Sequence, residues 1–393
     1  MHGPDAVDPD GLLEYSVVFT ERSLNHMSRR FQQVMRDISG TLRTTYAAAG
    51  AIVVPGGGTY GMESIARQFA GDRNCLVIRH GYFSYRWSQI LETGRIAKNI
   101  RVLKATQPTP GPREPFVPPA LDTVLATIRE DRPDVVFAPH VDTSSGMILP
   151  DDYLRAVGDA VHEHAGLFVL DCVASGAVWV DMRACSVDVL LTAPQKGWSA
   201  PPCAALVMLG DVAAERIEQT KSSSFACDLL RWRQIMRAYE KGGHAYHATM
   251  PTDALARFRD AMIETVELGL DEASRLQWEL GNRVRALLAE NGFPSVAAPG
   301  FEAPGVVVSY TDDPQVQNGS RFAALGMQIA AGVPLMCDEP AEFRTFRLGL
   351  FGLDKWKDVA GTVSRLENAL QSIAEDRLAA SGGESARIQT IDP

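Results

Sequence analysis

Lys196 stands out as a candidate for covalent chemistry. The chain has only 7 lysines against 31 arginines, and Lys196 closely follows the apolar run 187–192. A lysine in a half-buried place can have a lowered pKa, and the neutral amine is the form that makes a Schiff base. A surface lysine that extends its charge into water explains the same position equally well. Lys104 also ends an apolar run, but Arg101 and the polar loop that follows favour a solvated ammonium there.

Asp171 is a carboxylate at the end of the apolar run 167–171, which precedes the run that leads to Lys196. A buried carboxylate is costly unless it is paired, so a cationic partner is expected. An arginine could be that partner. The protonated pyridine nitrogen of pyridoxal phosphate (PLP) is the other candidate, because an aspartate at that nitrogen makes the ring an electron sink.

The segment 56–61 reads Gly-Gly-Gly-Thr-Tyr-Gly and lies between a short apolar run and a helical pattern. Backbone N–H groups at such a helix start can bind an anion, and phosphate fits best. The segment also matches the G-x-G-x-x-G pattern of dinucleotide sites, which requires an acidic residue about 20 positions further on. Arg79 and His80 end the next apolar run instead. We therefore favour a phosphate site, with a glycine turn that binds nothing as the alternative.

Apolar runs alternate with amphipathic stretches between about residues 50 and 210, which is typical of βαβ units on a parallel sheet. Strands are expected at 51–54, 75–79, 100–104, 135–139, 167–171, 187–192 and 204–209, with the last a candidate for an antiparallel strand. Helices are expected at 28–46, with Ser28 as N-cap, and at 62–69, 83–95, 121–129 and 153–164. Ligands of open α/β sheets bind at the carboxyl ends of the strands. The glycine segment, Asp171 and Lys196 should meet there.

The pattern changes after residue 250. A long helical pattern covers 252–290, shorter strands are expected near 306–310 and 346–350, and a helix near 355–375. We expect an N-terminal segment with a large α/β domain over 1–268 and a small α+β domain over 269–378. The Ser-, Gly- and Glu-rich end, 379–393, is expected to be disordered.

Composition excludes several classes of protein. The net charge is −10 and no Lys/Arg block interrupts it, so a nucleic-acid partner is not expected. The 6 cysteines are scattered without C-x-x-C spacing, which predicts reduced thiols, no metal site and a cytoplasmic location. Apolar runs stop well short of the roughly 20 residues of a membrane span, and the N-terminus lacks the pattern of a signal peptide. We therefore expect no membrane partner.

Seven motifs occur along the chain in the order GGGTYGME, HGYFSYR, HVDTSSGMILP, LDCVASG, TAPQKGWSAPP, AYHATMP and FRLGLFG. This series resembles the class V aminotransferases, PLP enzymes of fold type I that include alanine–glyoxylate and serine–glyoxylate aminotransferases. The resemblance covers roughly residues 25–375. It implies a fold-type I PLP-dependent transferase with a seven-stranded, mostly parallel sheet and a smaller C-terminal domain.

The resemblance also implies roles for individual residues. Lys196 would form the Schiff base with PLP, and Asp171 would bind the pyridine nitrogen. Phe83 would stack on the cofactor ring, Val173 would pack on the opposite face, and Thr143 would lie near the phenolic oxygen.

Further residues are implied for the phosphate and the substrate. Gly57, Gly58, Thr59 and Gln195 would hold the phosphate, and Tyr246 and Thr249 would reach it from a neighbouring subunit. A site shared in this way requires a homodimer. Arg347 in FRLGLFG would bind the substrate carboxylate through paired hydrogen bonds.

The N-terminal segment departs from the family pattern. EYSVVFTERSLNHMS replaces the usual Gly- and Pro-rich stretch, so Glu21, Arg22, Asn25 and His26 would line the substrate entrance. This change leaves the identity of the substrate open.

Together these residues predict an aminotransferase that moves an amino group from a small amino acid, of the alanine or serine type, to a small 2-oxo acid such as glyoxylate or pyruvate. Within the PLP enzymes, the alternatives are an aminophosphonate–pyruvate aminotransferase and a lyase or cysteine desulfurase that uses Cys337. A non-catalytic nucleotide-binding α/β module is the alternative outside them.

Overall fold

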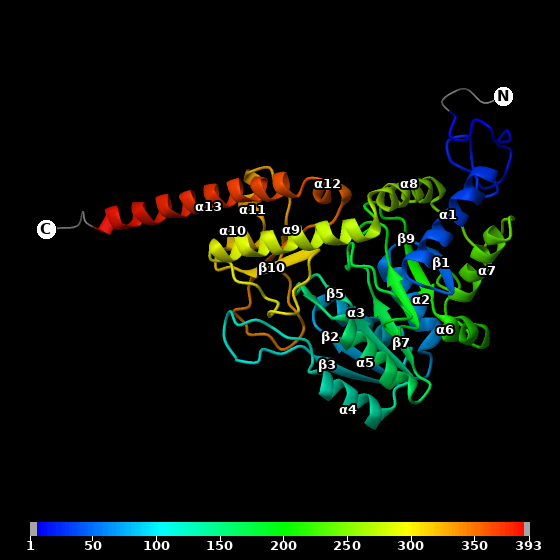
Figure 1. The fold of residues 1–393 in the computed structure, drawn as a ribbon, viewed down its shortest axis with the longest axis horizontal. Coiled ribbons are helices and arrows are strands. Elements are labelled where there is room, and N and C mark those ends of the chain that lie inside the picture. The colour runs from blue at the N-terminus through cyan, green and yellow to red at the C-terminus, as the bar shows by residue number, and fades with distance from the viewer. Residues whose placement is uncertain (1–5, 389–393) are drawn as a thin grey trace.

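A seven-stranded sheet forms the centre of the protein (Figure 1). A computed structural model describes residues 6–388, with side chains for residues 6–375. The strands are β1 (Gly50–Pro55), β2 (Asn74–Arg79), β3 (Asn99–Lys104), β4 (Val135–Pro139), β7 (Leu167–Asp171), β8 (Val189–Thr192) and β9 (Ala204–Leu209). Their order is β1-β9-β8-β7-β4-β2-β3. Only β9 runs antiparallel to its neighbours β1 and β8. The predicted fold class is confirmed, as are the seven predicted strands.

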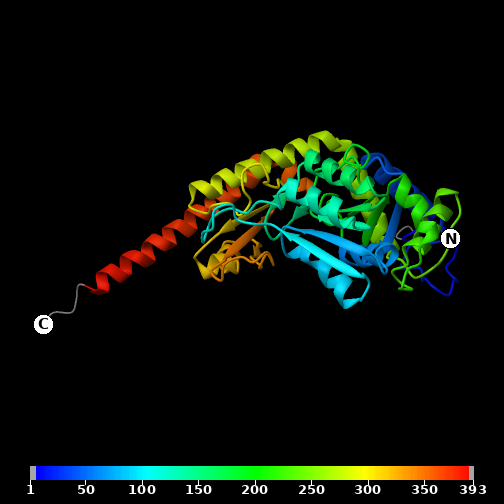
Figure 2. The ribbon, with the colours of Figure 1, turned by 90° about the horizontal axis from the view of Figure 1, so that it is seen from below.

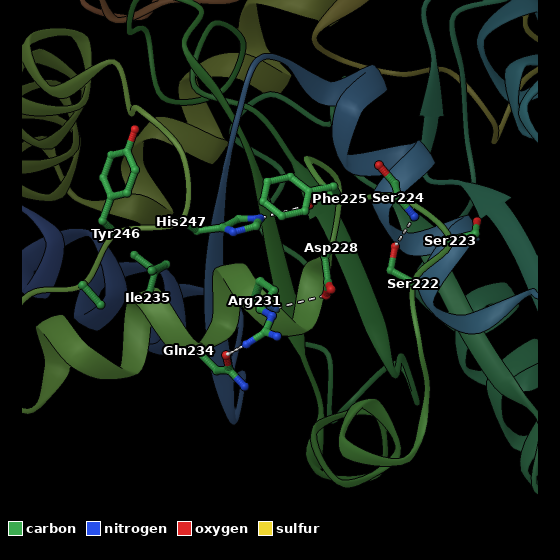
Figure 3. A pocket seen from close by; sticks show the side chains of 11 residues that line it. Ser222, Ser223, Ser224, Phe225, Asp228, Arg231, Gln234, Ile235, Tyr246 and His247 are labelled. Atoms are coloured by element: carbon green, nitrogen blue, oxygen red, sulfur yellow. Dashed lines mark hydrogen bonds between the residues drawn. The ribbon is translucent and has the colours of Figure 1, made fainter. Parts of the chain in front are cut away.

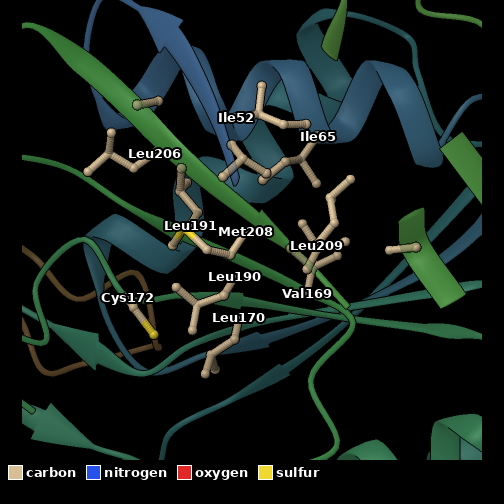
Figure 4. Packing of buried hydrophobic residues seen from close by; sticks show 14 of the residues in the cluster. Ile52, Ile65, Val169, Leu170, Cys172, Leu190, Leu191, Leu206, Met208 and Leu209 are labelled. Atoms are coloured by element: carbon tan, nitrogen blue, oxygen red, sulfur yellow. The ribbon is translucent and has the colours of Figure 1, made fainter. Parts of the chain in front are cut away.

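The strands are nearly continuous apolar runs because both faces of the sheet are covered. Every residue of β4, β7, β8 and β9 is buried. Figure 4 shows part of the resulting core, in which Ile52 of β1 lies beside Ile65 of α2, while Leu190 of β8 lies beside Leu170 of the neighbouring strand β7. The predicted helices that connect the strands are present as α2 (Gly58–Phe69), α3 (Tyr82–Thr93), α4 (Leu121–Asp131) and α5 (Asp151–His162).

Helix α1 (Arg29–Thr45) precedes the sheet and packs on β1, α7 (Leu229–Glu240) and α8 (Thr252–Leu268). The Oγ atom of Ser28 accepts a hydrogen bond from the backbone N–H of Phe31 at 3.0 Å, which confirms Ser28 as the N-cap. Helices α6 (Asp211–Arg216) and α7 were not predicted. The apolar spacing of Trp232, Ile235, Met236 and Tyr239 after Asp228 is the sequence signal for α7.

The C-terminal part is a separate small sheet covered by helices (Figures 1 and 2). Strands β10 (Val306–Tyr310), β12 (Thr345–Gly349) and β11 (Ala330–Ala331) pair antiparallel in that order. The surrounding helices are α9 (Leu270–Glu290), α10 (Pro314–Gln317), α11 (Ser320–Ala324), α12 (Leu353–Trp356) and α13 (Val359–Ile388). The helical pattern over 252–290 is divided between α8 and α9 at Gly269, whose φ of 95° no α-helix accommodates. A division into domains at this point remains a prediction.

Helix α13 extends beyond the body of the protein (Figure 2). The structure therefore places residues 379–388, which we expected to be disordered, in a helix. Alanine, the residue of highest helix propensity, is the commonest residue type over 379–388, although glycines and serines lie among the alanines. Residues 389–393 of the predicted tail lie outside the described residues. Among the helices described, none is both long and apolar enough to span a bilayer.

Candidate active site

Four parallel strands end side by side at the edge where the predicted residues gather. Strands β2, β4, β7 and β8 are consecutive neighbours in the sheet. In the register, Asp171 at the end of β7 lies opposite Pro139 of β4 and Leu191 of β8. Lys196 follows four residues after the end of β8. Strand pairing thus brings the acid beside the loop that carries the lysine.

Asp171 is a buried carboxylate without a cationic partner among the described residues. Only 6% of the residue is exposed, and the backbone N–H of Val173 donates to its Oδ1 atom at 3.0 Å. Burial raises the pKa of Asp171 to about 7 and the nearby charge of Asp142 adds to this rise, whereas the N–H of Val173 and the charge of Arg86 lower the pKa. Asp171 forms no ion pair with a described residue, so its carboxylate can still pair with a ligand cation.

Lys196 is half-buried, and none of the hydrogen bonds or ion pairs described involves its ammonium group. Its Nζ atom lies 5.0 Å from the ring centroid of Phe351. Burial lowers the pKa of Lys196, and the positive charge of Arg347 lowers it further. Beside it, the Oε1 atom of Gln195 is buried without a hydrogen-bond partner. Both the amine of Lys196 and the Oε1 atom of Gln195 are therefore available to bind a ligand.

The glycine segment begins helix α2, as expected for a phosphate site. Gly57 is the N-cap, and no side chain caps the helix. A Cβ atom on Gly57 would meet nothing within 4 Å, so the helix start is open, whereas one on Gly58 would approach Val173 Cγ2 to 2.9 Å. The Oγ1 atom of Thr59 accepts a hydrogen bond from Arg86 at 3.1 Å. An arginine therefore stands beside the predicted phosphate position.

Two guanidinium groups lie near the ring of Phe83. The Cζ atom of Arg86 is 4.8 Å, and that of Arg347 5.7 Å, from its ring centroid. Arg347 comes from β12 of the small sheet, donates to the carbonyl oxygen of Ala331 at 2.8 Å and reaches the carbonyl oxygen of Thr143 at 3.4 Å. Its pKa is lowered by burial, against the attraction of Asp142. The guanidinium of Arg347 thus lies near both the ring of Phe83 and the backbone of Thr143 within one chain.

Sequence reasoning missed Arg86 and Asp142 at this site. Both lie inside quoted motifs, HGYFSYR and HVDTSSGMILP, but spacing alone does not show that their charges face the site. Neither Arg86 nor Lys196 nor Arg347 forms an ion pair among the described residues, although ion pairs are numerous elsewhere.

The remaining predicted residues form a second group. Tyr246 and Thr249 are exposed and joined by a hydrogen bond of 3.0 Å between their hydroxyl groups. His26 is buried with an unpartnered Nδ1 atom, and its ring lies 5.5 Å from that of Tyr246 and 5.8 Å from that of His244. Asn25 donates to Glu14 at 2.7 Å. No described contact connects this group to Asp171, Lys196 or Arg347 within one chain.

Tyr246 also borders a surface cavity of about 630 Å³ (Figure 3). Residues 222–225, the first turns of α7 and residues 245–247 line it. His247 packs on Phe225, with ring centroids 4.7 Å apart, and Phe225 is 77% exposed. This cavity is on the side of the second group and is not formed by Lys196 or Asp171.

Cys337 is unsuited to act as a nucleophile. It is 5% exposed, and its Sγ atom lies 3.7 Å from the carbonyl oxygens of Arg79 and Leu335. Burial raises the pKa of this thiol to about 12, so the reactive thiolate is scarce. This environment argues against the desulfurase alternative. All 6 cysteines are unpaired and buried.

The arrangement fits PLP. A buried acid without a cation suits the pyridine nitrogen, a lysine with a lowered pKa suits the aldehyde carbon, and an uncapped helix start beside Arg86 suits a phosphate. The orphaned Oε1 atom of Gln195 requires a donor, which a singly protonated phosphate or a water molecule provides.

Comparisons with known proteins also point to PLP-dependent aminotransferases. The protein has the fold of the fold-type I PLP-dependent aminotransferases. The structure of an alanine–glyoxylate aminotransferase from Nostoc sp. superposes with a TM-score of 0.74 at 22% identity, covering 88% of this chain and 89% of that chain.

Curated relatives extend the comparison. Alanine–glyoxylate aminotransferase 1 of Saccharomyces cerevisiae is 28% identical in an alignment of 315 positions that covers 74% of this chain and 78% of the relative. A protein named soluble hydrogenase, small subunit, from Synechococcus sp. is 24% identical in an alignment of 394 positions that covers 99% of this chain and 97% of the relative. No family model matches the chain. The resemblance seen in the motifs is confirmed, and the names of the yeast and Nostoc proteins agree with the predicted enzyme class.

Two histidines are buried beside the site. His80 follows β2 and has no hydrogen-bond partner on either ring nitrogen, and His140 follows β4 with its Nδ1 atom 2.7 Å from Ser175 Oγ. Burial lowers the pKa of His80 to about 4 and that of His140 to about 3. Both are therefore neutral in the folded protein at neutral pH.

We predict that these histidines make the apoprotein sensitive to acid. An unfolded histidine binds a proton below about pH 6.5, whereas folded His80 does so only near pH 4, so stability is lost as the pH falls through this window. Between pH 7.5 and 5.5, His80→Asn should lose about 1 kcal/mol less stability than the wild type. Urea unfolding at both pH values measures the difference.

Asp171 has the opposite effect on the pH dependence of stability. Because its pKa is raised in the folded protein, it lowers stability as the pH rises from about 4 to about 7. Comparing each variant with the wild type at both pH values cancels this effect, and His140→Asn should change in the same direction as His80→Asn. Parallel losses in the wild type and both variants would contradict the prediction.

Proposed function

We propose that the protein is a PLP-dependent aminotransferase that moves an amino group from a small amino acid, of the alanine or serine type, to a small 2-oxo acid such as glyoxylate or pyruvate. The observation that carries this proposal is the pairing, on adjacent strand ends, of a buried acid without a cation and a lysine with a lowered pKa. The yeast and Nostoc relatives named as alanine–glyoxylate aminotransferases support the choice of substrates.

The roles proposed for individual residues are those that the resemblance implies. Asp171 holds the pyridine nitrogen, Phe83 and Val173 enclose the ring, and Thr143 faces the phenolic oxygen. Lys196 attaches the cofactor as a Schiff base. Gly57, Gly58, Thr59 and Gln195 bind the phosphate, and Arg86 adds a positive charge beside it.

Bound PLP supplies an electron sink that weakens the bonds at the Cα atom of the amino acid. Lys196 moves the proton. The neutral amine of Lys196 would accept the proton of the substrate Cα atom at Nζ and would deliver it to the aldehyde carbon of PLP, because burial and Arg347 keep its pKa low.

Arg347 is placed to bind the substrate carboxylate. Its guanidinium is half-buried beside Phe83 and makes no ion pair among the described residues, so two hydrogen bonds to a carboxylate replace lost hydration. An aminophosphonate could use the same arginine, and this remains the alternative donor.

We also propose a homodimer in the cytoplasm. Tyr246 and Thr249 are exposed and remote from their own Lys196 in the network of contacts, which suits a role in the site of a second subunit. Asn25 and His26 lie on the same side and would then face the substrate entrance of the partner.

The first prediction tests the attachment of the cofactor. Borohydride reduction of the PLP-loaded protein should fix PLP on Lys196, because its amine is free of ion pairs. Lys104 is the matched control, since its Nζ atom is held by Asp338 at 2.6 Å. Peptide mapping locates the label. Lys196→Ala should abolish labelling and Lys104→Ala should not; label on Lys104 would contradict the proposed site.

The second prediction concerns the donor. Lysine offers a point charge where arginine offers two parallel hydrogen bonds, so Arg347→Lys should lower kcat/KM for alanine or serine by at least ~10-fold. Arg344→Lys, at a nearby exposed position, should leave it unchanged. A donor and acceptor screen measures both. If aminoethylphosphonate reacts well and depends equally on Arg347, the small amino acid is wrong as donor while aminotransfer stands.

The third prediction tests the shared site. Chains with Tyr246→Ala and chains with Lys196→Ala should be inactive alone but regain activity when mixed under conditions of subunit exchange. One site of the heterodimer then combines an intact Lys196 with the partner's intact Tyr246.

The control for this experiment mixes Lys196→Ala with Asp171→Asn chains. Lys196 and Asp171 lie in the same chain's site, so neither site of that heterodimer is complete and activity should not return. Rescue in this control, or none in the Tyr246→Ala mixture, would show that the assignment to two chains is wrong.

A further inference from the structure

Asp142 is a second buried carboxylate beside the site, and no function has been assigned to it above. It ends the short strand β5 (Val141–Asp142) and is fully buried. No ion pair involving it is described, yet donors surround it. Its Oδ1 atom accepts from the N–H and Oγ–H groups of Ser144 at 3.0 and 2.6 Å, and lies 3.4 Å from the N–H of Phe83. Its Oδ2 atom accepts from the N–H and Oγ–H of Ser84 at 2.7 and 2.8 Å.

These bonds join two segments that carry predicted site residues. The donors Phe83 and Ser84 form the first turn of α3, and Thr143 directly follows Asp142. The Oγ atom of Ser144 also accepts from the N–H of Tyr82 at 2.7 Å, which reinforces the connection. The two segments approach so closely that a Cβ atom on Gly81 would overlap the side chains of Ser144 and Asp142. The backbone under the ring of Phe83 is therefore held from β5.

The charge of Asp142 also acts on the site. It attracts the guanidinium of Arg347, whose pKa it raises against burial, and it raises the pKa of Asp171. Arg347 in turn reaches the carbonyl oxygen of Thr143, next to Asp142. Asp142 thus accepts hydrogen bonds from helix α3, which carries Phe83. Its charge also acts on Arg347 and Asp171.

We propose that Asp142 is a positioning residue that sets the plane of Phe83 against the cofactor ring and keeps Thr143 and Arg347 in register with it. This inference rests on the proposed function, because it assigns Asp142 a role toward bound PLP. An aspartate that only stabilises the start of α3 is the alternative, and it predicts a loss of stability without a change in the bound cofactor.

The sharpest variant is Asp142→Asn. Both oxygens of Asp142 accept from backbone N–H groups, so an amide in either orientation turns its NH₂ group toward an N–H donor. Asp188 is the matched control. It is also a buried carboxylate that accepts a backbone N–H, from Phe168 at 2.8 Å, and it pairs in addition with His162 at 2.9 Å; it directly precedes β8, away from the site.

The experiment measures three quantities for the wild type, Asp142→Asn and Asp188→Asn: urea stability of the apoprotein, the Kd for PLP, and the visible circular dichroism per bound PLP. The last quantity reports how the ring is held. Asp142→Asn should raise the Kd about 10-fold and reduce the dichroism. Asp188→Asn should lower stability while both cofactor readouts stay as in the wild type.

Ser144→Ala provides a second variant should Asp142→Asn fail to fold. It removes one hydrogen bond to Asp142 without placing an amide against a donor, and it should change both cofactor readouts in the same direction by a smaller amount. Wild-type Kd and dichroism in the folded Asp142→Asn variant, or in Ser144→Ala if the former does not fold, would overturn the inference. A wild-type protein that binds no PLP would instead overturn the proposed function.

Discussion

Uncompensated charge at one edge of the sheet is the constraint on which the site depends. Asp171 has lost its water without gaining a cation, while Lys196, Arg86 and Arg347 have no anionic partner among the described residues. In a medium of low dielectric constant such groups attract ligands of opposite charge more strongly than water allows. PLP together with a substrate carboxylate would offer a cation to Asp171 and anions to Arg86 and Arg347, while the amine of Lys196 would bond to the cofactor.

The rest of the fold keeps these charges in place. The loop after β7 is held by Gln277 of α9, which accepts from the N–H of Ala177 at 3.1 Å. The loop that carries Lys196 is tied to the small sheet's side by Ser199, whose Oγ atom accepts from the N–H of Leu353 at 2.8 Å. Because Arg347 also comes from that side, the C-terminal part supports the lysine loop and supplies a charge.

The sequence predicted the sheet well because strands buried on both faces are continuous apolar runs. It made Asp171 and Lys196 candidates because polar residues at the ends of such runs are conspicuous. The hydrogen bonds of Asp142 could not be predicted from the sequence, since they depend on the approach of β5 to α3. The break at Gly269 was hidden by uninterrupted helical spacing on both sides. The relation of Tyr246 to Lys196 was inferred from resemblance alone, because spacing within one chain carries no information about a second one.

The contact between Gly176 and Gly197 bears on how such a protein can diverge. A Cβ atom on Gly197 would overlap the backbone of Gly176, so the loop after Asp171 and the loop that carries Lys196 touch main chain to main chain. No side chain lies between them to be exchanged for a larger or smaller one. At this contact, the distance between the two loops therefore cannot be tuned by the size of a side chain. Changes in substrate preference have to accumulate in the surrounding parts, such as the N-terminal segment and the neighbourhood of Arg347, where side chains still separate one backbone from the next.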